Sequence, residues 1–246
     1  MYNFFVKPEN KRDKTVIIVG ADYNHIKNVL RFKVGEMFLA SVNGKSNLCR
    51  LIEFLDGSAV AEIVEENYQD TSLPIKIYLF QGLPKSDKFE LIIQKAVELG
   101  VEKIFPVQTE RCIVKLDDKK KDGKVARWNT IAESAAKQSK RTSIPMVNGV
   151  LTLREALEVS KELDLLLIPY ENKEGILATK EAFALIKKGI KIGVVIGPEG
   201  GFSQSEIDFA ESYGAKIISL GKRILRTETA SIATLSALML HAEMNL

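Results

Sequence analysis

Two glycine-containing loops carry the residues whose types and spacing could do chemistry. Residues 194–206 read VVIGPEGGFSQSE, in which an apolar run ends in three glycines, a proline and one acid before a helix begins. The glycines let the backbone turn sharply and let another group approach it closely. Ser203 and Glu206 have the spacing of a helix capping box. The loop is therefore predicted to join a buried strand to a helix, where open α/β sheets bind ligands; a tight turn that merely needs glycine is the simpler alternative.

Glu199, in the middle of this loop, narrows the class of ligand. A carboxylate repels phosphate, and the phosphate-binding motifs GxxxxGK[ST] and GxGxxG do not occur in the chain. Phosphoryl transfer and a nicotinamide or ATP site are therefore disfavoured. A hydroxyl group, an amino group or a cation suits the carboxylate better. The alternative is that Glu199 only ties its own loop together.

A second loop lies at residues 219–230, SLGKRILRTETA, and leads into a helix that is apolar or small on nearly every side. Such a helix must be buried, and part of it is expected to lie against another subunit. Arg226 stands at its start, where free backbone N–H groups attract acceptors and anions. Thr227 or Thr229 is a candidate for the N-cap. We expect the two loops to lie at adjacent strand ends and to form one pocket.

The elements that position these loops fall into two parts. Residues 1–70 predict short strands, a hairpin turn at Asn43-Gly44 and one short helix, which together suggest a small β-barrel. QDTSLP (69–74) is a candidate linker. From Pro74 onward, near-continuous apolar strands alternate with helices, which indicates a parallel sheet covered on both faces. The predicted fold class is α/β, with domains at 1–70 and 74–246.

The charge distribution favours a polyanionic partner. The chain has 246 residues and a net charge of +3, but residues 103–142 alone hold eleven Lys/Arg and only five Asp/Glu. A basic stretch of this kind attracts nucleic acid. The alternative is a solvated helix face.

Metal and membrane sites are not expected. The two histidines and two cysteines show no ligand spacing, so no metal is predicted. No apolar run approaches the roughly 20 residues of a membrane span, and the start MYNFFVKPEN is no signal peptide. Because Cys49 and Cys112 lie far apart and in no CxxC pair, a reduced, cytoplasmic protein is the expectation.

Both loops resemble the signature motifs of a known family. IGPEGGFSQSE (196–206) and SLGKRILRTETA (219–230) resemble those of the RsmE family, the 16S ribosomal RNA uridine-N3 methyltransferases of the SPOUT superfamily. Matching segments elsewhere are NHIKNVLRFKVGE (24–36), KSDKFELIIQKAVELGVEKIFPVQTERC (85–112) and AESAAKQSKRTSIP (132–145). The similarity covers almost the whole chain, and the pairing of the two loops makes it specific.

The resemblance implies a PUA-like N-terminal β-barrel and a SPOUT domain whose C-terminal segment forms a deep trefoil knot, assembled as a homodimer. It implies S-adenosylmethionine as the methyl donor. The implied acceptor is N3 of a uridine, uridine 1498, in 16S rRNA of the small ribosomal subunit. The glycines would let one backbone segment thread past another and press on a bent cofactor. The cofactor-binding residues that the resemblance implies are Ile168, Pro169, Ile196, Gly197, Glu199, Gly200, Gly201, Leu220, Gly221, Ile224, Leu225, Arg226, Thr229 and Ala230.

The catalytic candidates are Arg226, Glu199 and Glu228. Uracil N3 carries a proton and is a poor nucleophile until that proton leaves. Arg226 would stabilise the resulting anion at O2 or O4. Glu199 or Glu228 would accept the proton, although bulk water could also serve. The RNA-binding candidates are Arg31, Arg111, Lys137, Gln138 and Arg141, with diffuse phosphate attraction from Lys119 to Lys121.

Two other functions stay open at this stage. The first is a knotted methyltransferase that acts on another RNA position. The second is a non-catalytic RNA-binding or ribosome-assembly factor with a relic pocket. The intact glycine loop and the ILRTETA segment argue against the second, and cofactor binding distinguishes it from an enzyme.

Overall fold

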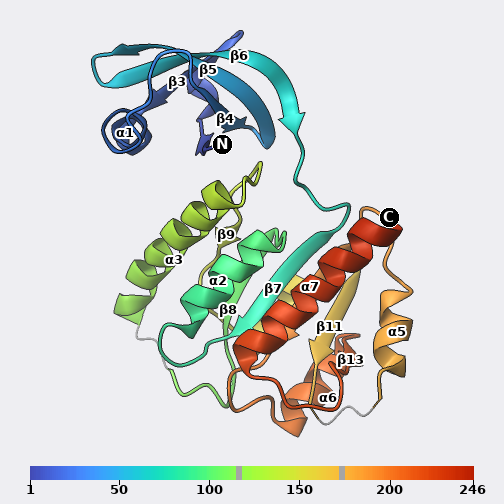
Figure 1. The fold of residues 1–246 in the computed structure, drawn as a ribbon. Coiled ribbons are helices and arrows are strands. Elements are labelled where there is room, and N and C mark those ends of the chain that lie inside the picture. Colours follow the sequence, from blue (N-terminus) through green and yellow to red (C-terminus); the bar gives the residue numbers. More distant parts are fainter. Residues whose placement is uncertain (115–117, 172–174) are drawn as a thin grey trace. The chain divides into compact units, whose positions relative to one another are not determined.

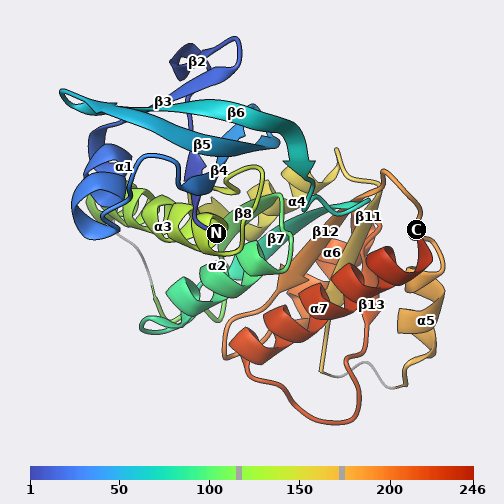
Figure 2. The ribbon, with the colours of Figure 1, turned by 45° about the horizontal axis from the view of Figure 1, so that its top comes forward.

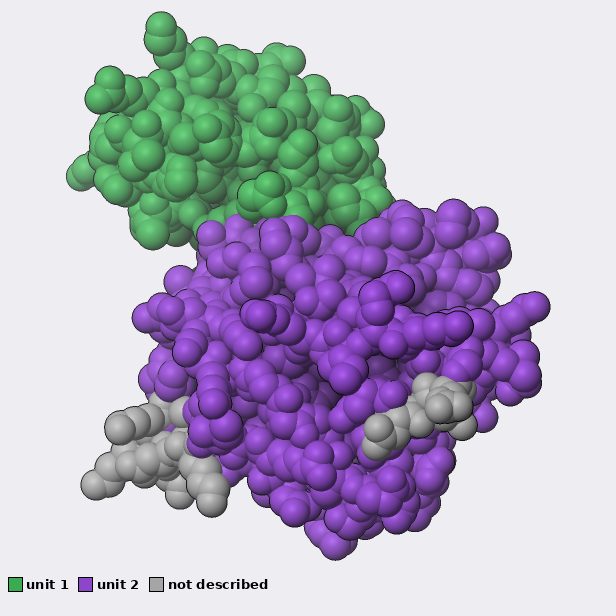
Figure 3. Space-filling view, turned by 60° about the horizontal axis from the view of Figure 1, so that its bottom comes forward, with its two compact units in different colours: residues 1–72, 136–144 green, residues 73–135, 145–246 purple. Residues whose placement is uncertain are grey.

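The computed structural model describes residues 1–114, 118–171 and 175–246, with the backbone alone for residues 118–120. They form two compact units, shown in different colours in Figure 3. Unit 1 consists of residues 1–72 and 136–144, and unit 2 consists of residues 73–135 and 145–246. The domain limits expected from the sequence did not assign residues 136–144 to the N-terminal part, and those limits stay a prediction.

Unit 1 is built on one six-stranded sheet with the order β1-β4-β5-β6-β3-β2. All neighbouring strands are antiparallel except β1 and β4, which run parallel. Its strands are β1 (Asn3–Phe5), β2 (Lys11–Arg12), β3 (Thr15–Val19), β4 (Met37–Val42), β5 (Lys45–Leu55) and β6 (Ser58–Gln69). That the sheet forms a PUA-like barrel stays a prediction.

Two features of unit 1 follow directly from its residues. Asn43 and Gly44 both have positive φ, as a two-residue hairpin turn requires, so the predicted hairpin between β4 and β5 is confirmed. The predicted helix is a short α-helix, α1 (Gly20–Asn24), continued by a π-helical turn at His25–Val29. Ile26 of that turn packs into the core of the sheet. Burial raises the pKa of the Cys49 thiol in this core to about 12.

Unit 2 contains the parallel sheet that the alternating pattern predicts. Its strand order is β10-β8-β7-β12-β11-β13, with β9 paired to β8, and every recorded pair is parallel. The strands are β7 (Lys76–Gly82), β8 (Lys103–Gln108), β9 (Met146–Val147), β10 (Leu151–Thr152), β11 (Leu165–Pro169), β12 (Lys191–Ile196) and β13 (Lys216–Ile218). The expected α/β class with a parallel sheet flanked by helices is confirmed.

Helices cover both faces of this sheet. They are α2 (Lys88–Glu98), α3 (Asp118–Gln138), α4 (Leu153–Ser160), α5 (Leu177–Phe183), α6 (Gln204–Ser212) and α7 (Thr227–Asn245). Apolar residues of α4 and α6 form one buried cluster with β7, β8 and β12, which includes the stacked rings of Phe80 and Phe105. Helices α2 and α7 lie side by side on the other face (Figures 1 and 2).

Candidate functional site

The two loops singled out from the sequence meet at the carboxyl end of the parallel sheet. We call residues 197–202, which follow β12, the glycine loop, and residues 219–226, which follow β13, the connector loop. The expectation that their strands are adjacent is wrong, because β11 pairs with both and lies between them. The end of β11, Ile168 and Pro169, therefore stands between the two loops, and these two residues were among the predicted cofactor contacts.

Gly82, at the end of β7, permits a close approach of two backbone segments at the site. A Cβ at this position would lie 2.7 Å from Cδ and N of Pro198 and 2.9 Å from the carbonyl carbon of Gly197. A side chain larger than hydrogen would therefore force the backbones apart. The sequence reasoning did not select Gly82, since nothing in its neighbours indicates which segment passes over it.

The glycine loop is held by hydrogen bonds along its length. The N–H of Gly201, which has a φ of +63°, donates to the carbonyl of Pro198 at 3.0 Å. Arg111 Nη1 donates to the carbonyl of Gly200 at 3.0 Å, and a Cβ on Gly200 would lie 3.0 Å from Arg111 Cβ. Arg111 was expected to contact RNA. In the structure it braces this loop.

The predicted capping box fixes the start of α6. Ser203 Oγ accepts from the N–H of Glu206, and Glu206 Oε2 accepts from the N–H of Ser203. Glu206 also accepts from the N–H of Glu110 at 2.8 Å. The box that the sequence predicts is confirmed, and it also joins the glycine loop to the end of β8.

Glu199 is held by donors from the start of α2. Lys88 Nζ lies 3.0 Å from Glu199 Oε1, and the backbone N–H of Lys85 donates to the same carboxylate at 3.1 Å. Partial burial alone would raise the pKa of Glu199. The bond from Lys88 and the backbone N–H groups outweigh it, and the pKa lies below its usual range. The carboxylate is therefore ionised at neutral pH and is a weak base.

The start of α7 differs from the prediction. Neither Thr227 nor Thr229 is the N-cap; Arg226 occupies that position and its side chain forms no capping bond. The reason is that the Thr227 hydroxyl is used elsewhere. It donates to the carbonyl of Gly197 at 2.6 Å and accepts from Gln81 Nε2 at 3.0 Å. Thr227 thus fixes α7 to the glycine loop instead of ending its own helix.

Gln81 is the buried centre of this connection. It is 0% exposed, although glutamine is polar, and its side chain bonds to α7 through both of its polar atoms. Nε2 donates to Thr227, and Oε1 accepts from the hydroxyl of Ser231. The sequence reasoning missed Gln81 as well. A glutamine inside an apolar strand, IYLFQGL, was the available signal, because a buried amide needs partners.

Glu228, in the first turn of α7, also faces Lys88. Its Oε2 lies 3.7 Å from Lys88 Nζ, and its side chain is 16% exposed. Among the described residues, this oxygen is buried and accepts no hydrogen bond. Lys88 therefore lies close to two of the three catalytic candidates.

The connector loop exposes residues 221–224 and 226 to solvent. Ile224 is 87% exposed, and Arg226 is exposed as well. Gly221 has a φ of +104°, with no atom within 4 Å of a Cβ built there. At its start, the loop is tied to α5 by Thr179, whose hydroxyl donates to the carbonyl of Ser219 at 2.7 Å. Exposed apolar and cationic side chains at a strand end are available to a ligand.

The remaining cofactor candidates lie in the same region, and their side chains range from buried to exposed. Ile196 of β12 is buried, so it can offer only its backbone to a ligand. Leu220, Leu225 and Ala230 are half-buried, and Thr229 is exposed. The structure thus brings all the predicted cofactor segments to the carboxyl edge of one sheet.

The RNA-binding candidates of unit 1 divide by exposure. Arg31, with a φ of +54°, and Gln138 are exposed. Lys137 Nζ forms an ion pair with Asp22 at 2.8 Å. Arg141 is 6% exposed, and its carbonyl accepts from Asn3 Nδ2. Direct contact of the Arg141 side chain with RNA does not fit this burial, and the side chains of Lys119 and Lys120 lie outside the described residues.

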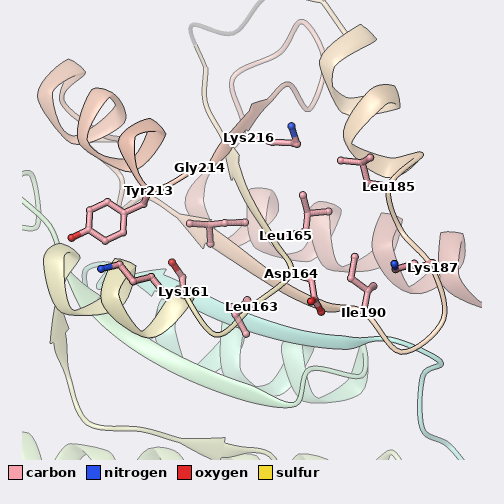
Figure 4. A pocket seen from close by; sticks show the side chains of 12 residues that line it. Lys161, Leu163, Asp164, Leu165, Leu185, Lys187, Ile190, Tyr213, Gly214 and Lys216 are labelled. Carbon is pink, nitrogen blue, oxygen red and sulfur yellow. The ribbon is translucent and has the colours of Figure 1, made fainter.

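The pocket in Figure 4 lies at the opposite end of the sheet. It is lined by residues at the amino ends of three strands, among them Leu165, Ile190 and Lys216. None of the predicted cofactor residues lines it. Since open parallel sheets bind ligands at the carboxyl ends of their strands, we place the candidate site at the two loops.

Two negative findings concern the described part of the chain. It holds no group of three or more His, Cys, Asp or Glu that could bind a metal ion. Within the same residues, no helix has the length and apolar character needed to cross a bilayer.

Comparisons with known proteins identify the family to which the chain is similar. Residues 71–239 match a family model described as an RNA methyltransferase domain. Ribosomal RNA small subunit methyltransferase E of Bacillus subtilis is 36% identical, over 99% of this chain and 98% of that protein. A crystal structure of a protein of the same name from Neisseria gonorrhoeae, bound to S-adenosyl methionine, is 34% identical with a TM-score of 0.82, and the match covers 98% of this chain and 97% of that one. A methyltransferase structure from Legionella pneumophila with the bound cofactor SAM is 29% identical, also with a TM-score of 0.82, covering 97% and 96%.

Proposed function

Because the chain belongs to the RNA methyltransferase family, among the ribosomal RNA small subunit methyltransferases E, we propose that it methylates 16S rRNA with S-adenosylmethionine as donor. The acceptor in this proposal is N3 of a uridine. The observation that carries it is the meeting of the glycine loop and the first turn of α7, joined by the bond from Thr227 to Gly197. The backbone of the glycine loop, two carboxylates and an arginine lie at this edge of the sheet and support the proposal.

The residues at this edge fit the cofactor. S-adenosylmethionine, when bound, supplies a methyl group from its positively charged sulfonium. Glu199 and Glu228 carry two negative charges against the one positive charge of Lys88, and the remaining negative charge favours a cationic ligand. We assign the adenine to the backbone of Leu220, Ile224 and Leu225. The close approach of the glycine loop to Gly82 supports the proposal that the C-terminal segment is knotted, since threading needs backbones to pass in contact.

Arg226 is the residue we assign to the reacting base. It is exposed at the N-cap of α7, and arginine stays charged at any pH the enzyme meets. Its guanidinium would hold the negative charge that develops on O2 or O4 as the N3 proton leaves. Glu199 is held ionised by its donors, and Glu228 Oε2 is buried. We therefore assign the proton to solvent water and give both carboxylates a part in ordering the site.

We assign the RNA to exposed polar residues of unit 1, namely Arg31 and Gln138, and we propose that the protein forms a homodimer. Support for the dimer comes from apolar side chains that α7 and its neighbour α2 leave exposed. Leu240 and Met244 of α7 are 47% and 72% exposed, and Leu91 of α2 is 41% exposed. Exposed apolar side chains on two neighbouring helices are a feature of subunit interfaces.

The test is methyl transfer from labelled S-adenosylmethionine to small ribosomal subunits from cells that lack this modification. Digestion and mass spectrometry of the RNA then locate the label. Protein-free 16S rRNA and large subunits serve as comparison substrates. A single 3-methyluridine in 16S rRNA is the expected result. A labelled base elsewhere would move the target to another RNA position, and absence of cofactor binding would favour a non-catalytic RNA-binding factor.

A further inference from the structure

Lys88 occupies an electrostatically unfavourable place. It is the first residue of α2, an eleven-residue helix that starts shortly after β7. The amino end of a helix carries partial positive charge, so a cation there is repelled unless anions compensate it. Two carboxylates from other parts of the chain supply that compensation.

The two ion pairs of Lys88 come from the two segments that form the candidate site. Its Nζ lies 3.0 Å from Glu199 Oε1 on the glycine loop and 3.7 Å from Glu228 Oε2 on α7. The exposed fractions of the three side chains are 32%, 29% and 16%. Because all three are mostly shielded from water, their attraction exceeds that of a pair on the open surface.

Glu228 depends on Lys88 more than Glu199 does. Glu199 also accepts from the backbone of Lys85, whereas Glu228 Oε2 is buried and, within the described part of the chain, accepts no hydrogen bond. A buried carboxylate without a partner is strongly unfavourable. In this structure the recorded ion pair of Glu228 is the one with Lys88.

We propose that Lys88 is a positioning residue for the methyl transfer: its ammonium holds Glu199 and Glu228 together, so that the glycine loop and the first turn of α7 keep the spacing that one bound cofactor requires. This rests on the proposed function. Lys88 contacts neither the cofactor nor the base in the proposal and acts through the two carboxylates. Gln81 and Thr227 join the same two segments independently, so the fold does not depend on Lys88 alone.

The experiment compares Lys88→Met and Lys88→Arg with a matched control, Lys95→Met. Lys95 lies on the same helix and pairs at 2.9 Å with Glu98, three residues further on. Affinity for S-adenosylmethionine is measured by calorimetry, and kcat and KM by methyl transfer to small subunits. Misplacement of a site by about 1 Å costs about 100-fold in rate, so we expect Lys88→Met to lower kcat/KM by about 10- to 100-fold and to weaken cofactor binding. Lys88→Arg should recover most of this, and Lys95→Met should match the wild type.

A double-mutant cycle separates positioning from general stability. If Lys88 acts through Glu199, Lys88→Met should weaken cofactor binding at least about 3-fold less in a Glu199→Gln background than in the wild type. Equal effects in both backgrounds, or a Lys88→Met variant that binds and reacts like Lys95→Met, would overturn the proposal. If Lys88→Met does not fold, Lys88→Gln, which keeps a polar side chain at the start of α2, replaces it in the same cycle, and the same outcomes support or overturn the proposal.

The measurements on the wild-type protein distinguish failure of this proposal from failure of the proposed function. A wild-type protein that neither binds S-adenosylmethionine nor methylates the subunit rejects both the function and the role of Lys88 in it. If the wild-type protein is active and the Lys88 variants bind cofactor and react as the wild type does, only the positioning role of Lys88 is rejected.

Discussion

The glycine loop follows β12 and the connector loop follows β13, with β11 between these strands, and the protein holds the two loops in different ways. The glycine loop is bonded to Arg111, Lys85, Lys88 and Thr227, and Gly82 packs directly beneath it. The connector loop is tied at its start by Thr179 and ends in exposed side chains such as Ile224. One wall of the candidate site is therefore built by the chain itself. The other wall, the connector loop, has exposed side chains that a bound ligand can hold in place. We therefore expect the two loops to respond differently to mutation and to the cofactor.

The largest expected effect is on the connector loop and concerns rate. Arg226→Ala should lower kcat by about 100- to 1000-fold, since it removes the charge that stabilises the uracil anion. Because Arg226 is exposed and makes no capping bond, the melting temperature should stay within about 2 °C of the wild type. Methyl-transfer kinetics and calorimetry measure the two quantities.

The matched control for this variant is Arg223→Ala, which removes an exposed arginine from the same loop. It should leave kcat within a few-fold of the wild type. An equal loss of rate in both variants would mean that the loop needs positive charge in general and would reject a specific contact by Arg226.

The second effect separates the loops by their response to ligand. S-adenosylmethionine at about 100 times its dissociation constant should stabilise the folded protein by about 2.7 kcal/mol. Limited proteolysis at Lys222 and Arg223 of the connector loop should slow strongly on binding, because the ligand covers that loop. Cleavage at Lys216, on β13 and outside both loops, should slow only as much as global stability requires. Equal protection from proteolysis at all three positions would show that the cofactor does not cover the connector loop in particular, and would contradict the comparison of the two loops.

The third effect tests the packing under the glycine loop. Gly82→Ala should lower the free energy of unfolding by about 1–3 kcal/mol, because its Cβ would meet the backbone at Gly197. Gly221→Ala in the connector loop should cost about 1 kcal/mol, from its positive φ alone. Gly149→Ala, with open space and no positive φ, is the control and should stay within about 0.5 kcal/mol. Denaturant titration gives all three values, and a smaller loss for Gly82 than for Gly221 would contradict the comparison.

The smallest effect is the pH dependence that Glu199 gives the glycine loop. Its pKa in the folded protein lies below the ordinary value of 4.5. A carboxyl with a lowered folded pKa adds stability above its unfolded pKa, and this contribution disappears as the pH falls through the folded value. Wild type should thus exceed Glu199→Gln by about 0.5–1 kcal/mol at pH 7, and the gap should close below pH 4.5. If the difference in the free energy of unfolding between the wild type and Glu199→Gln stays constant down to pH 3, the charge of the Glu199 carboxylate is not its cause.

The sequence predicted the parts of this molecule that depend on local pattern. The alternation of apolar strands with helices, the Asn43-Gly44 hairpin and the Ser203–Glu206 capping box all follow from residues close together in the chain, and all are confirmed. The order of the strands in the sheet could not be predicted from such local patterns. Nothing within a strand's own residues shows which strands will be its neighbours, so β11 was not expected between the strands that lead to the two loops.

The residues missed at the site share one property: their partners are far away in the sequence. Lys88 meets Glu199 at a separation of 111 residues, and Gln81 meets Thr227 at 146. A local pattern cannot show such a meeting. The N-cap of α7 was predicted wrongly for the same reason. Threonine is a suitable residue type for an N-cap, but the hydroxyl of Thr227 bonds to Gly197 and Gln81 instead.

The bond between Gln81 and Thr227 has a consequence for synthesis of the protein. Ribosomes add roughly 5–20 residues per second, so the 146 residues from the one after Gln81 up to Thr227 take about 7–30 s to make. During that time β7 can pair with β8, but the amide of Gln81 has to remain hydrated, because its partners on α7 do not yet exist. The carboxyl end of the sheet can therefore close only when the last helix has left the exit tunnel. A chain that stops before α7 is expected to leave this end open and to be recognised by chaperones as unfinished.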